Sequence, residues 1–251
     1  MTKVIAMANH KGGVGKTTST VNIGTILTLR GKRVLLVDLD AQANLTASLL
    51  VEQPERTIYD AIKERKNIPV IPIRENLDIV PSCLDLAGIE LEIGGTFSRE
   101  TILKELLEPL KGKYDYILLD CAPSLGLLTV NAFTAANSVI IPLTAEALPV
   151  AGIEKIQDFM KLVQDKLNPG LFLEGIIITR YMKKNLSSLI EDNLRGVFGE
   201  KVYKTRIREN VSVAEAPLKK TDITTYAPSS NGAEDYKNLV NEILSLQGDK
   251  E

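Results

Sequence analysis

The segment NHKGGVGKTT, residues 9–18, combines closely spaced glycines with two lysines and two threonines. The glycines allow backbone conformations that aim successive N–H groups at one anion. Lys16 can neutralise phosphate charge, and the hydroxyl of Thr17 is a hard oxygen ligand of the kind that Mg²⁺ prefers. The segment therefore predicts a phosphate-binding loop, or P-loop. The residues expected to contact the phosphates are Gly12, Gly13, Val14, Gly15, Lys16, Thr17 and Thr18.

The flanking sequence supplies a strand before this loop and a helix after it. The apolar run VIAMA, residues 4–8, predicts the strand, and the helix is expected to begin at Lys16. A strand, a glycine-rich turn and a helix in this order are the setting that a P-loop requires. One alternative is a tight turn that binds no ligand. The other is a dinucleotide-binding fingerprint, which fits less well because Thr18 stands where its third glycine should be.

Short β-branched apolar runs alternate with longer helical patterns along the rest of the chain. Strands are expected at residues 4–8, 33–38, 77–81, 116–120, 138–142 and 173–179. Helices are expected at residues 16–30, 58–66, 98–110, 147–167, 186–198 and 231–246. Most of the expected strands are continuous apolar runs, which is typical of strands covered on both faces. The pattern predicts an α/β fold with a mostly parallel, twisted sheet, helices on both faces, and a single domain over residues 1–251.

The composition is that of an ordinary globular protein. Hydrophobic residues make up 44% and charged residues 25%, which excludes the disordered and fibrous classes. The N-terminus lacks the apolar region and cleavage site of a secretory signal, and no apolar stretch approaches the length of a membrane span. Only two cysteines, Cys83 and Cys121, occur, so reduced thiols and a cytoplasmic location are expected.

The net charge of −2 conceals an uneven distribution. Residues 180–220 carry ten basic and five acidic side chains, a local charge of +5 that leaves −7 for the remainder. A basic face on an otherwise acidic protein is a candidate site for a polyanion. An ordinary solvated surface of helices and loops is the alternative.

The loop sequence KGGVGKTT resembles the deviant Walker A motif of the ParA/MinD class of P-loop ATPases. The resemblance continues through VDLDAQAN, LLDCAPSLGLLTVNA, ITRY and NVSVAEAP, and so covers nearly the whole chain. His10 occupies the position of the first glycine of an ordinary P-loop, and Lys11 matches the signature lysine of the class. The resemblance implies that ATP and Mg²⁺ are bound and that two subunits dimerise around ATP. Lys11 of each subunit would then reach the nucleotide of the other, much as an arginine finger acts in trans.

Two aspartates at expected strand ends match further positions of the class. Asp40 matches the aspartate that helps to position the attacking water near Mg²⁺, and Asp120 matches the Walker B aspartate that holds Mg²⁺ through water. Helix capping is the alternative for such an aspartate, and capping or a supporting role is preferred for Asp38. The resemblance thus implies catalytic roles for Lys11, Lys16 and Asp40. It implies metal contacts for Thr17, Asp40 and Asp120, and proximity to the adenine for Thr179, Arg180 and Pro217.

Several residues depart from the pattern of the class. Ala41 and Ala43 replace the proline and glycine often seen after the switch aspartate, and Cys121 replaces a small residue. The related nitrogenase iron protein shares a cluster between subunits through two cysteines each. Because Cys83 and Cys121 lack its flanking pattern, buried thiols are expected instead.

The charged residues of the C-terminal part distinguish between two branches of this class, which bind lipid or DNA. The MinD branch ends in a basic amphipathic helix that binds lipid, but the tail YKNLVNEILSLQGDKE has only two lysines, so membrane binding is disfavoured. The ParA/Soj branch binds non-specific DNA as an ATP dimer. Glu209 and Ser212 stand where that branch often places arginines. The expected compensating DNA contacts are Lys183, Lys184, Arg206, Arg208, Lys219 and Lys220.

The sequence therefore predicts a Mg²⁺-dependent ATPase of weak intrinsic activity that acts in plasmid or chromosome partition at the nucleoid. A ParB/Spo0J-like centromere-binding protein is the expected partner and stimulates hydrolysis. Two alternatives stay open: a positioning ATPase for another cargo, either MinD-like or for protein clusters, and a metabolic P-loop enzyme resembling dethiobiotin synthetase.

Overall fold

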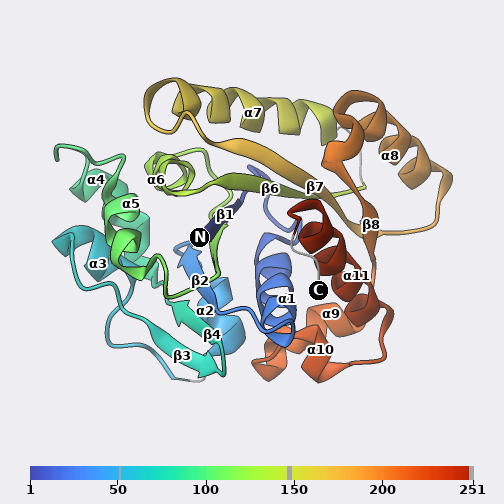
Figure 1. Ribbon diagram of the computed structural model, residues 1–251, viewed down its shortest axis with the longest axis horizontal. Helices are drawn as coiled ribbons and strands as arrows, with labels where there is room; N and C mark the ends of the chain where they lie inside the picture. Colours follow the sequence, from blue (N-terminus) through green and yellow to red (C-terminus); the bar gives the residue numbers. More distant parts are fainter. Residues whose placement is uncertain (51, 146–148, 249–251) are drawn as a thin grey trace.

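A central sheet of eight strands organises the protein (Figure 1). The structure is a computed structural model that describes residues 1–50, 52–145 and 149–248. The strand order is β3-β4-β2-β5-β1-β6-β7-β8, and within the described residues every neighbouring pair is parallel except β3 and β4. The strands are β1 (Lys3–Met7), β2 (Val34–Leu39), β3 (Ile71–Arg74), β4 (Leu77–Val80), β5 (Tyr116–Cys121), β6 (Ser138–Thr144), β7 (Phe172–Tyr181) and β8 (Val202–Arg208).

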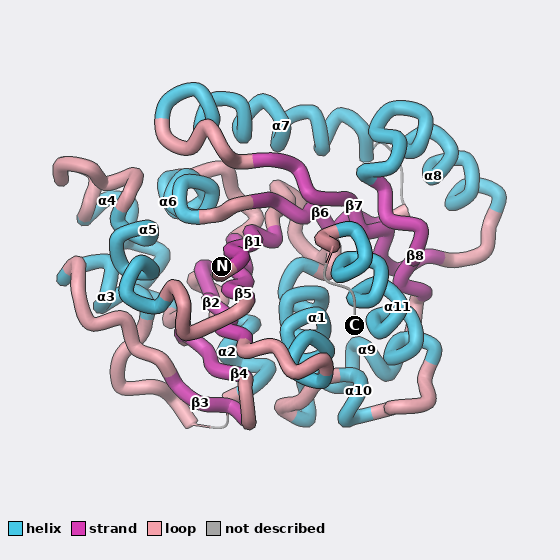
Figure 2. Tube along the Cα trace, viewed as in Figure 1, coloured by secondary structure: helices cyan, strands magenta, loops and turns pink. Residues whose placement is uncertain are grey.

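Helices cover both faces of this sheet (Figure 2). The α-helices are α1 (Lys16–Leu29), α2 (Asn44–Leu49), α3 (Ile58–Glu64), α4 (Ile89–Glu92), α5 (Ile102–Leu107), α6 (Leu127–Ala135), α7 (Pro149–Lys166), α8 (Asn185–Phe198), α9 (Val211–Glu215), α10 (Ile223–Tyr226) and α11 (Asn231–Leu246). Short 3-10 turns are η1 (Leu84–Gly88), η2 (Glu108–Leu110), η3 (Gly199–Lys201) and η4 (Ala216–Lys219). Among the described residues, none of the helices combines the length and apolar character needed to cross a bilayer.

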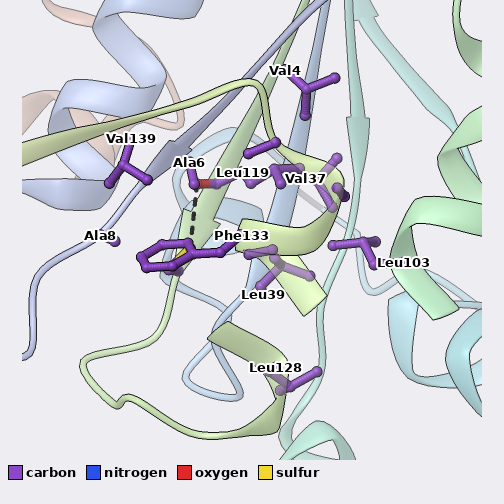
Figure 3. Packing of buried hydrophobic residues seen from close by; sticks show 14 of the residues in the cluster. Val4, Ala6, Ala8, Val37, Leu39, Leu103, Leu119, Leu128, Phe133 and Val139 are labelled. Atoms are coloured by element: carbon purple, nitrogen blue, oxygen red, sulfur yellow. Dashed lines mark hydrogen bonds between the residues drawn. The ribbon is translucent and has the colours of Figure 1, made fainter. Parts of the chain in front are cut away.

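Two hydrophobic cores lie on opposite faces of the sheet because successive strand side chains alternate between the faces. Along β1, Ile5 and Met7 join the core beneath α1, α2, α10 and α11. Val4 and Ala6 join the other core, which α3, α5, α6, α7 and α8 cover. Figure 3 shows Phe133 of α6 among strand side chains of this second core.

The predicted fold class is confirmed, and all six predicted strands are present with ends that shift by at most two residues. The helix predicted from residue 98 begins only at Ile102. Of the helix predicted over residues 147–167, which corresponds to α7, residues 147 and 148 lie outside the described residues. The prediction missed β3 and β8, which are the two edge strands. An edge strand contains polar and charged residues that interrupt an apolar run, as in VYKTRIR of β8.

Candidate nucleotide and magnesium site

The loop between β1 and α1 has the geometry of an anion cradle. Gly13 and Gly15 have φ angles of 72° and 85°, in the left-handed region that glycine enters without a Cβ clash. The 14-residue helix α1 begins directly after Gly15, and its first turn contains no acidic residue. Unpaired N–H groups and the positive end of the helix dipole therefore face the loop, which suits a phosphate group.

The entrance of the loop is fixed by Asn9 and His10. The Asn9 side chain donates to Pro142 O over 2.7 Å and accepts from the Lys11 backbone N–H over 3.0 Å. The His10 ring packs on α7 at Gly152, where an added Cβ would lie only 2.7 Å from His10 Cε1. Burial, and then Lys155, lowers the pKa of His10, so this ring stays neutral at physiological pH. The substitution of histidine for the first P-loop glycine is thus accommodated by a missing side chain on α7.

The two lysines of the loop have different environments. Lys16 is only 7% exposed, and its Nζ donates to the Lys11 carbonyl over 3.0 Å. Burial lowers the pKa of Lys16, and the nearby Asp120 opposes this effect. The side chain of Lys11 is exposed to solvent. Lys16 is therefore held inside its own loop, whereas Lys11 is available to another molecule.

Asp120 lies at the carboxyl end of β5, where it contacts the first turn of α1. Its carboxylate accepts a 2.7 Å hydrogen bond from Thr17 Oγ1 and a longer one of 3.4 Å from Thr20 Oγ1. Burial, and then Asp38 on the paired strand β2, raises the pKa of Asp120. A cation at this point would stabilise the charged carboxylate. The hydroxyl and carboxylate oxygens of Thr17 and Asp120 are donors that fit Mg²⁺.

Asp38, within β2, and Asp40, directly after it, have different roles. The buried Asp38 carboxylate accepts hydrogen bonds from the Thr46 backbone N–H (2.8 Å) and hydroxyl (2.7 Å), so it supports the first turn of α2 from β2, whereas the N-cap position of this helix is Ala43. Asp40 is partly exposed, and its Oδ1 accepts from the Gln42 backbone N–H over 3.0 Å. Ser82 Oγ donates to the Asp40 carbonyl over 2.8 Å. The Asp40 loop is thus held from both sides while its carboxylate stays accessible to water.

The three residues expected near the adenine lie in different settings. Thr179 is 3% exposed and donates to Val14 O and Leu143 O over 2.9 and 3.0 Å. Arg180 is exposed, has a φ angle of 49°, and lies 3.4 Å from Glu209. Pro217 is half-buried in η4. The structure therefore brings Thr179 to the phosphate loop itself.

The basic residues expected to bind DNA fall into two places. Lys183, Arg206 and Arg208 line one groove of about 890 Å³, which also includes Lys204. Lys184 is exposed at the start of α8. Lys219 and Lys220 lie at the end of η4, and Lys220 Nζ donates to the carbonyl of Ala47 in α2.

The two arginines of the groove are already paired within the protein. Arg206 lies 2.6 Å from the buried Glu191 and stacks over the ring of Tyr181 at 4.9 Å. Arg208 lies 2.6 Å from the nearly buried Asp235. Each arginine is thus held by an internal carboxylate, although Glu191 is shared with Arg195, whereas the exposed lysines of this surface extend into solvent.

The two cysteines have free thiols. Cys121 is buried, as expected, and burial raises the pKa of its thiol. Cys83 is only half-buried, because it lies at the start of η1 beside Thr57 rather than within the sheet.

Sequence reasoning missed the hydroxyl residues that hold the acidic groups. Thr20 contacts Asp120, Thr46 contacts Asp38, and Ser82 contacts the Asp40 loop. Thr20 could have been found, because it follows Lys16 by one helical turn and so faces the same side of α1. Thr46 and Ser82 had no comparable signal, since the fold brings them to the site from separate segments.

Comparison with known proteins agrees with this geometry. A family described as "AAA domain" matches residues 2–173. The sporulation initiation inhibitor protein Soj of Bacillus subtilis is 45% identical over 98% of this chain and 99% of its own length. This chain belongs to the ParA/Soj family of P-loop ATPases. The chromosome partitioning protein ParA of Caulobacter vibrioides, also of this family, is 38% identical over 99% of this chain and 96% of its own length.

Some of the solved structures similar to this ParA/Soj chain contain nucleotide. Cobyrinic acid a,c-diamide synthase from Mycobacterium smegmatis, with bound ATP analogue and magnesium, has a TM-score of 0.87 and 33% identity over 98% of this chain and 96% of its own. A protein described as a plasmid partition protein, from Borrelia burgdorferi with bound AMPPNP, has a TM-score of 0.84 and 29% identity over 98% of this chain and 100% of its own. The predictions of the family, of ATP hydrolysis, and of ATP with Mg²⁺ as cofactors are thereby confirmed.

Proposed function

We propose that this chain is an ATP-driven partition ATPase that moves chromosomal or plasmid DNA, and that residues 1–251 act as one domain. The observation that carries the proposal is the cluster of Lys16, Thr17 and Asp120 at the junction of β1, α1 and β5. The similarity to Soj and ParA over nearly the full chain supports the choice of cargo.

The residues of the site have separable roles in this proposal. Lys16 leaves the Lys11 carbonyl and binds the terminal phosphates. Thr17 and Asp120 would hold Mg²⁺ with their oxygen atoms. The metal would screen phosphate charge when bound. Asp40, whose carboxylate is accessible, orients the attacking water, and Arg180 and Pro217 lie near the base.

Lys11 has its role in a dimer. Its exposed side chain extends from a loop whose other lysine is turned inward, so it can reach phosphate charge on a second copy. A cation supplied by a partner stabilises the nucleotide only while both subunits are present. ATP binding and dimerisation are then linked by thermodynamic necessity.

The ATP dimer binds non-specific DNA through lysine-rich surfaces, which places the protein at the nucleoid in the cytoplasm. The proposed contacts are Lys183, Lys184, Arg206, Arg208, Lys219 and Lys220. A ParB/Spo0J-like protein that binds the centromere stimulates hydrolysis and so releases the dimer from DNA. Membrane binding through the C-terminal helix is not part of the proposal, because the apolar face of α11, including Leu239 and Ile243, is buried in the core.

The decisive experiment measures DNA binding with ATP, ADP and no nucleotide across a salt series, for wild type and Lys11→Ala. We expect the wild type to bind only with ATP and to weaken steeply with salt, because phosphate contacts release counterions. Lys11→Ala should still bind ATP, with the lower affinity of the monomer, and should lose the ATP-dependent DNA binding. Light scattering on Asp40→Ala with saturating ATP should show a dimer, and a monomer there would overturn the proposal.

The same preparation tests the other candidates. A small-molecule product formed under ATP turnover would favour a metabolic enzyme, to which the similarity with the diamide synthase points. ATP-dependent dimers that ignore DNA but bind a different adaptor would favour a positioning ATPase for another cargo.

A further inference from the structure

Thr179 is a buried residue on β7 that contacts the phosphate loop. Its register partner on β6 is Thr144, and only 3% of its surface is exposed. The hydroxyl lies 2.9 Å from Val14 O in the loop and 3.0 Å from Leu143 O in β6. A threonine hydroxyl has one proton, so these two carbonyls share it. The hydroxyl therefore ties the phosphate loop to the central sheet.

The methyl group of Thr179 contacts the same loop. An added Cβ on Gly15 would lie 3.4 Å from Thr179 Cγ2, so the side chain packs directly against that glycine. Val14 and Gly15 are consecutive, and Gly15 has the left-handed φ of 85° that directs the chain into α1. The hydroxyl and the methyl group of Thr179 thus both contact the turn that orients the N–H groups of the loop.

The residues after Thr179 connect this contact to the basic groove. Tyr181, two positions later, places its ring under the Arg206 guanidinium, and its carbonyl accepts from the Glu209 backbone N–H over 3.1 Å. The end of β7 therefore contacts the phosphate loop through Thr179 and lines the basic groove through Tyr181.

We propose that Thr179 is a positioning residue that holds the phosphate loop in its binding conformation. It acts through the Val14 carbonyl on the backbone that binds the polyphosphate, and its buried hydroxyl makes no contact with the base. The inference rests on the proposed function only in requiring that this loop binds nucleotide phosphates. DNA binding is not used in its test, so a failure of the partition proposal would leave the result readable.

The test compares Thr179→Val, which keeps the shape and removes the hydroxyl, with Thr179→Ser, which keeps the hydroxyl. Binding of a fluorescent ATP analogue is measured directly, and inorganic tripolyphosphate is measured by competition. We expect Thr179→Val to weaken both ligands by the same factor, about fivefold to twentyfold, which is the effect of one hydrogen bond. Thr179→Ser should stay within about twofold of wild type.

Three outcomes would overturn the proposal. Wild-type affinity of Thr179→Val would show that the hydroxyl has no role in the loop. Weakening of the ATP analogue without weakening of tripolyphosphate would assign Thr179 to the base. Equal losses in Thr179→Val and Thr179→Ser would indicate a packing effect. If Thr179→Val does not fold, as judged by circular dichroism, Thr179→Ala replaces it with the same expectation.

Discussion

The hydroxyl of Thr17, the second residue of α1, donates a 2.7 Å hydrogen bond to the buried carboxylate of Asp120. This contact joins the phosphate loop to the end of β5 and places two hard oxygen donors side by side. We predict that Thr17→Ala loses the part of ATP affinity that depends on Mg²⁺, by about tenfold or more, because a direct metal ligand is removed. ATP binding is measured with Mg²⁺ and with EDTA.

Thr17→Ser is the matched control, since it keeps the hydroxyl and should keep the Mg²⁺ effect. With EDTA, wild type and both variants should bind ATP alike. A Thr17→Ala protein that still gains affinity from Mg²⁺ would show that Thr17 is not a ligand.

Glycines of the phosphate loop differ in how much a methyl group would disturb them. At Gly15 the φ angle is 85° and an added Cβ would approach Thr179 to 3.4 Å, whereas Gly12 has no atom within 4 Å of that position and no positive φ. We predict that Gly15→Ala lowers the free energy of unfolding by about 1–2 kcal/mol, because an L-residue is strained in the left-handed region. Gly12→Ala should stay within about 0.5 kcal/mol of wild type.

Urea unfolding of the two variants without nucleotide checks this pair. Equal stabilities would contradict the role of backbone strain at Gly15. A large loss in Gly12→Ala would show instead that the loop tolerates no side chain at all.

Local sequence patterns were sufficient to predict the strands and helices that carry the nucleotide site. The run before the loop, the glycine spacing and the residues after Lys16 act on neighbouring positions, so their physics is visible in one sequence. The position of Asp120 was predictable in the same way, because a polar residue that follows an apolar run lies at the carboxyl end of its parallel strand, where ligands bind.

Contacts between distant segments could not be predicted in this way. Thr179 meets Val14 because β6 pairs with both β1 and β7, and no local feature of ITRY indicates it. The arginines of β8 give residues 180–220 a basic appearance, but Arg208 is paired with Glu234 and Asp235, two carboxylates that lie outside this segment. Charge counted along the chain therefore overstates the charge that the folded surface presents.

Exposed lysines and paired arginines should respond differently to substitution. We predict that the double variant Lys183→Glu, Lys184→Glu abolishes ATP-dependent DNA binding and leaves the unfolding free energy unchanged within about 0.5 kcal/mol. Arg208→Ala should lower the unfolding free energy by about 2 kcal/mol, because the nearly buried Asp235 loses its charged partner.

The matched control for charge is Lys161→Glu, Lys166→Glu, which makes the same change at exposed positions on α7. It should retain DNA binding at low salt. Equal loss of binding in the two double variants would mean that net charge, and not this surface, determines affinity.

The carboxylate of Asp222 anchors α10 to the body of the protein and predicts an acid-dependent stability. It is fully buried, accepts from the Thr224 and Thr225 backbone N–H groups over 2.8 and 3.1 Å, and lies 2.7 Å from Arg74 Nη2. Burial alone would raise the pKa of Asp222, but the hydrogen bonds from Thr224, Arg74 and Thr225 outweigh it and lower the pKa below its usual value.

We predict that Asp222→Asn lowers the unfolding free energy by about 2 kcal/mol at pH 7, since a charged hydrogen bond to Arg74 is lost. A depressed carboxyl pKa stabilises the fold above the unfolded pKa of about 3.9, and this stabilisation fades as the pH falls toward the lower folded value. Urea titrations at pH 7 and pH 3 should therefore show a clear difference between wild type and variant at pH 7 and a smaller one at pH 3. Glu64→Gln, in the exposed pair with Arg56, is the control and should leave the unfolding free energy nearly unchanged at both pH values, because solvent screens an exposed ion pair. A difference for Asp222→Asn that does not shrink in acid would mean that shape, rather than charge, makes this aspartate important.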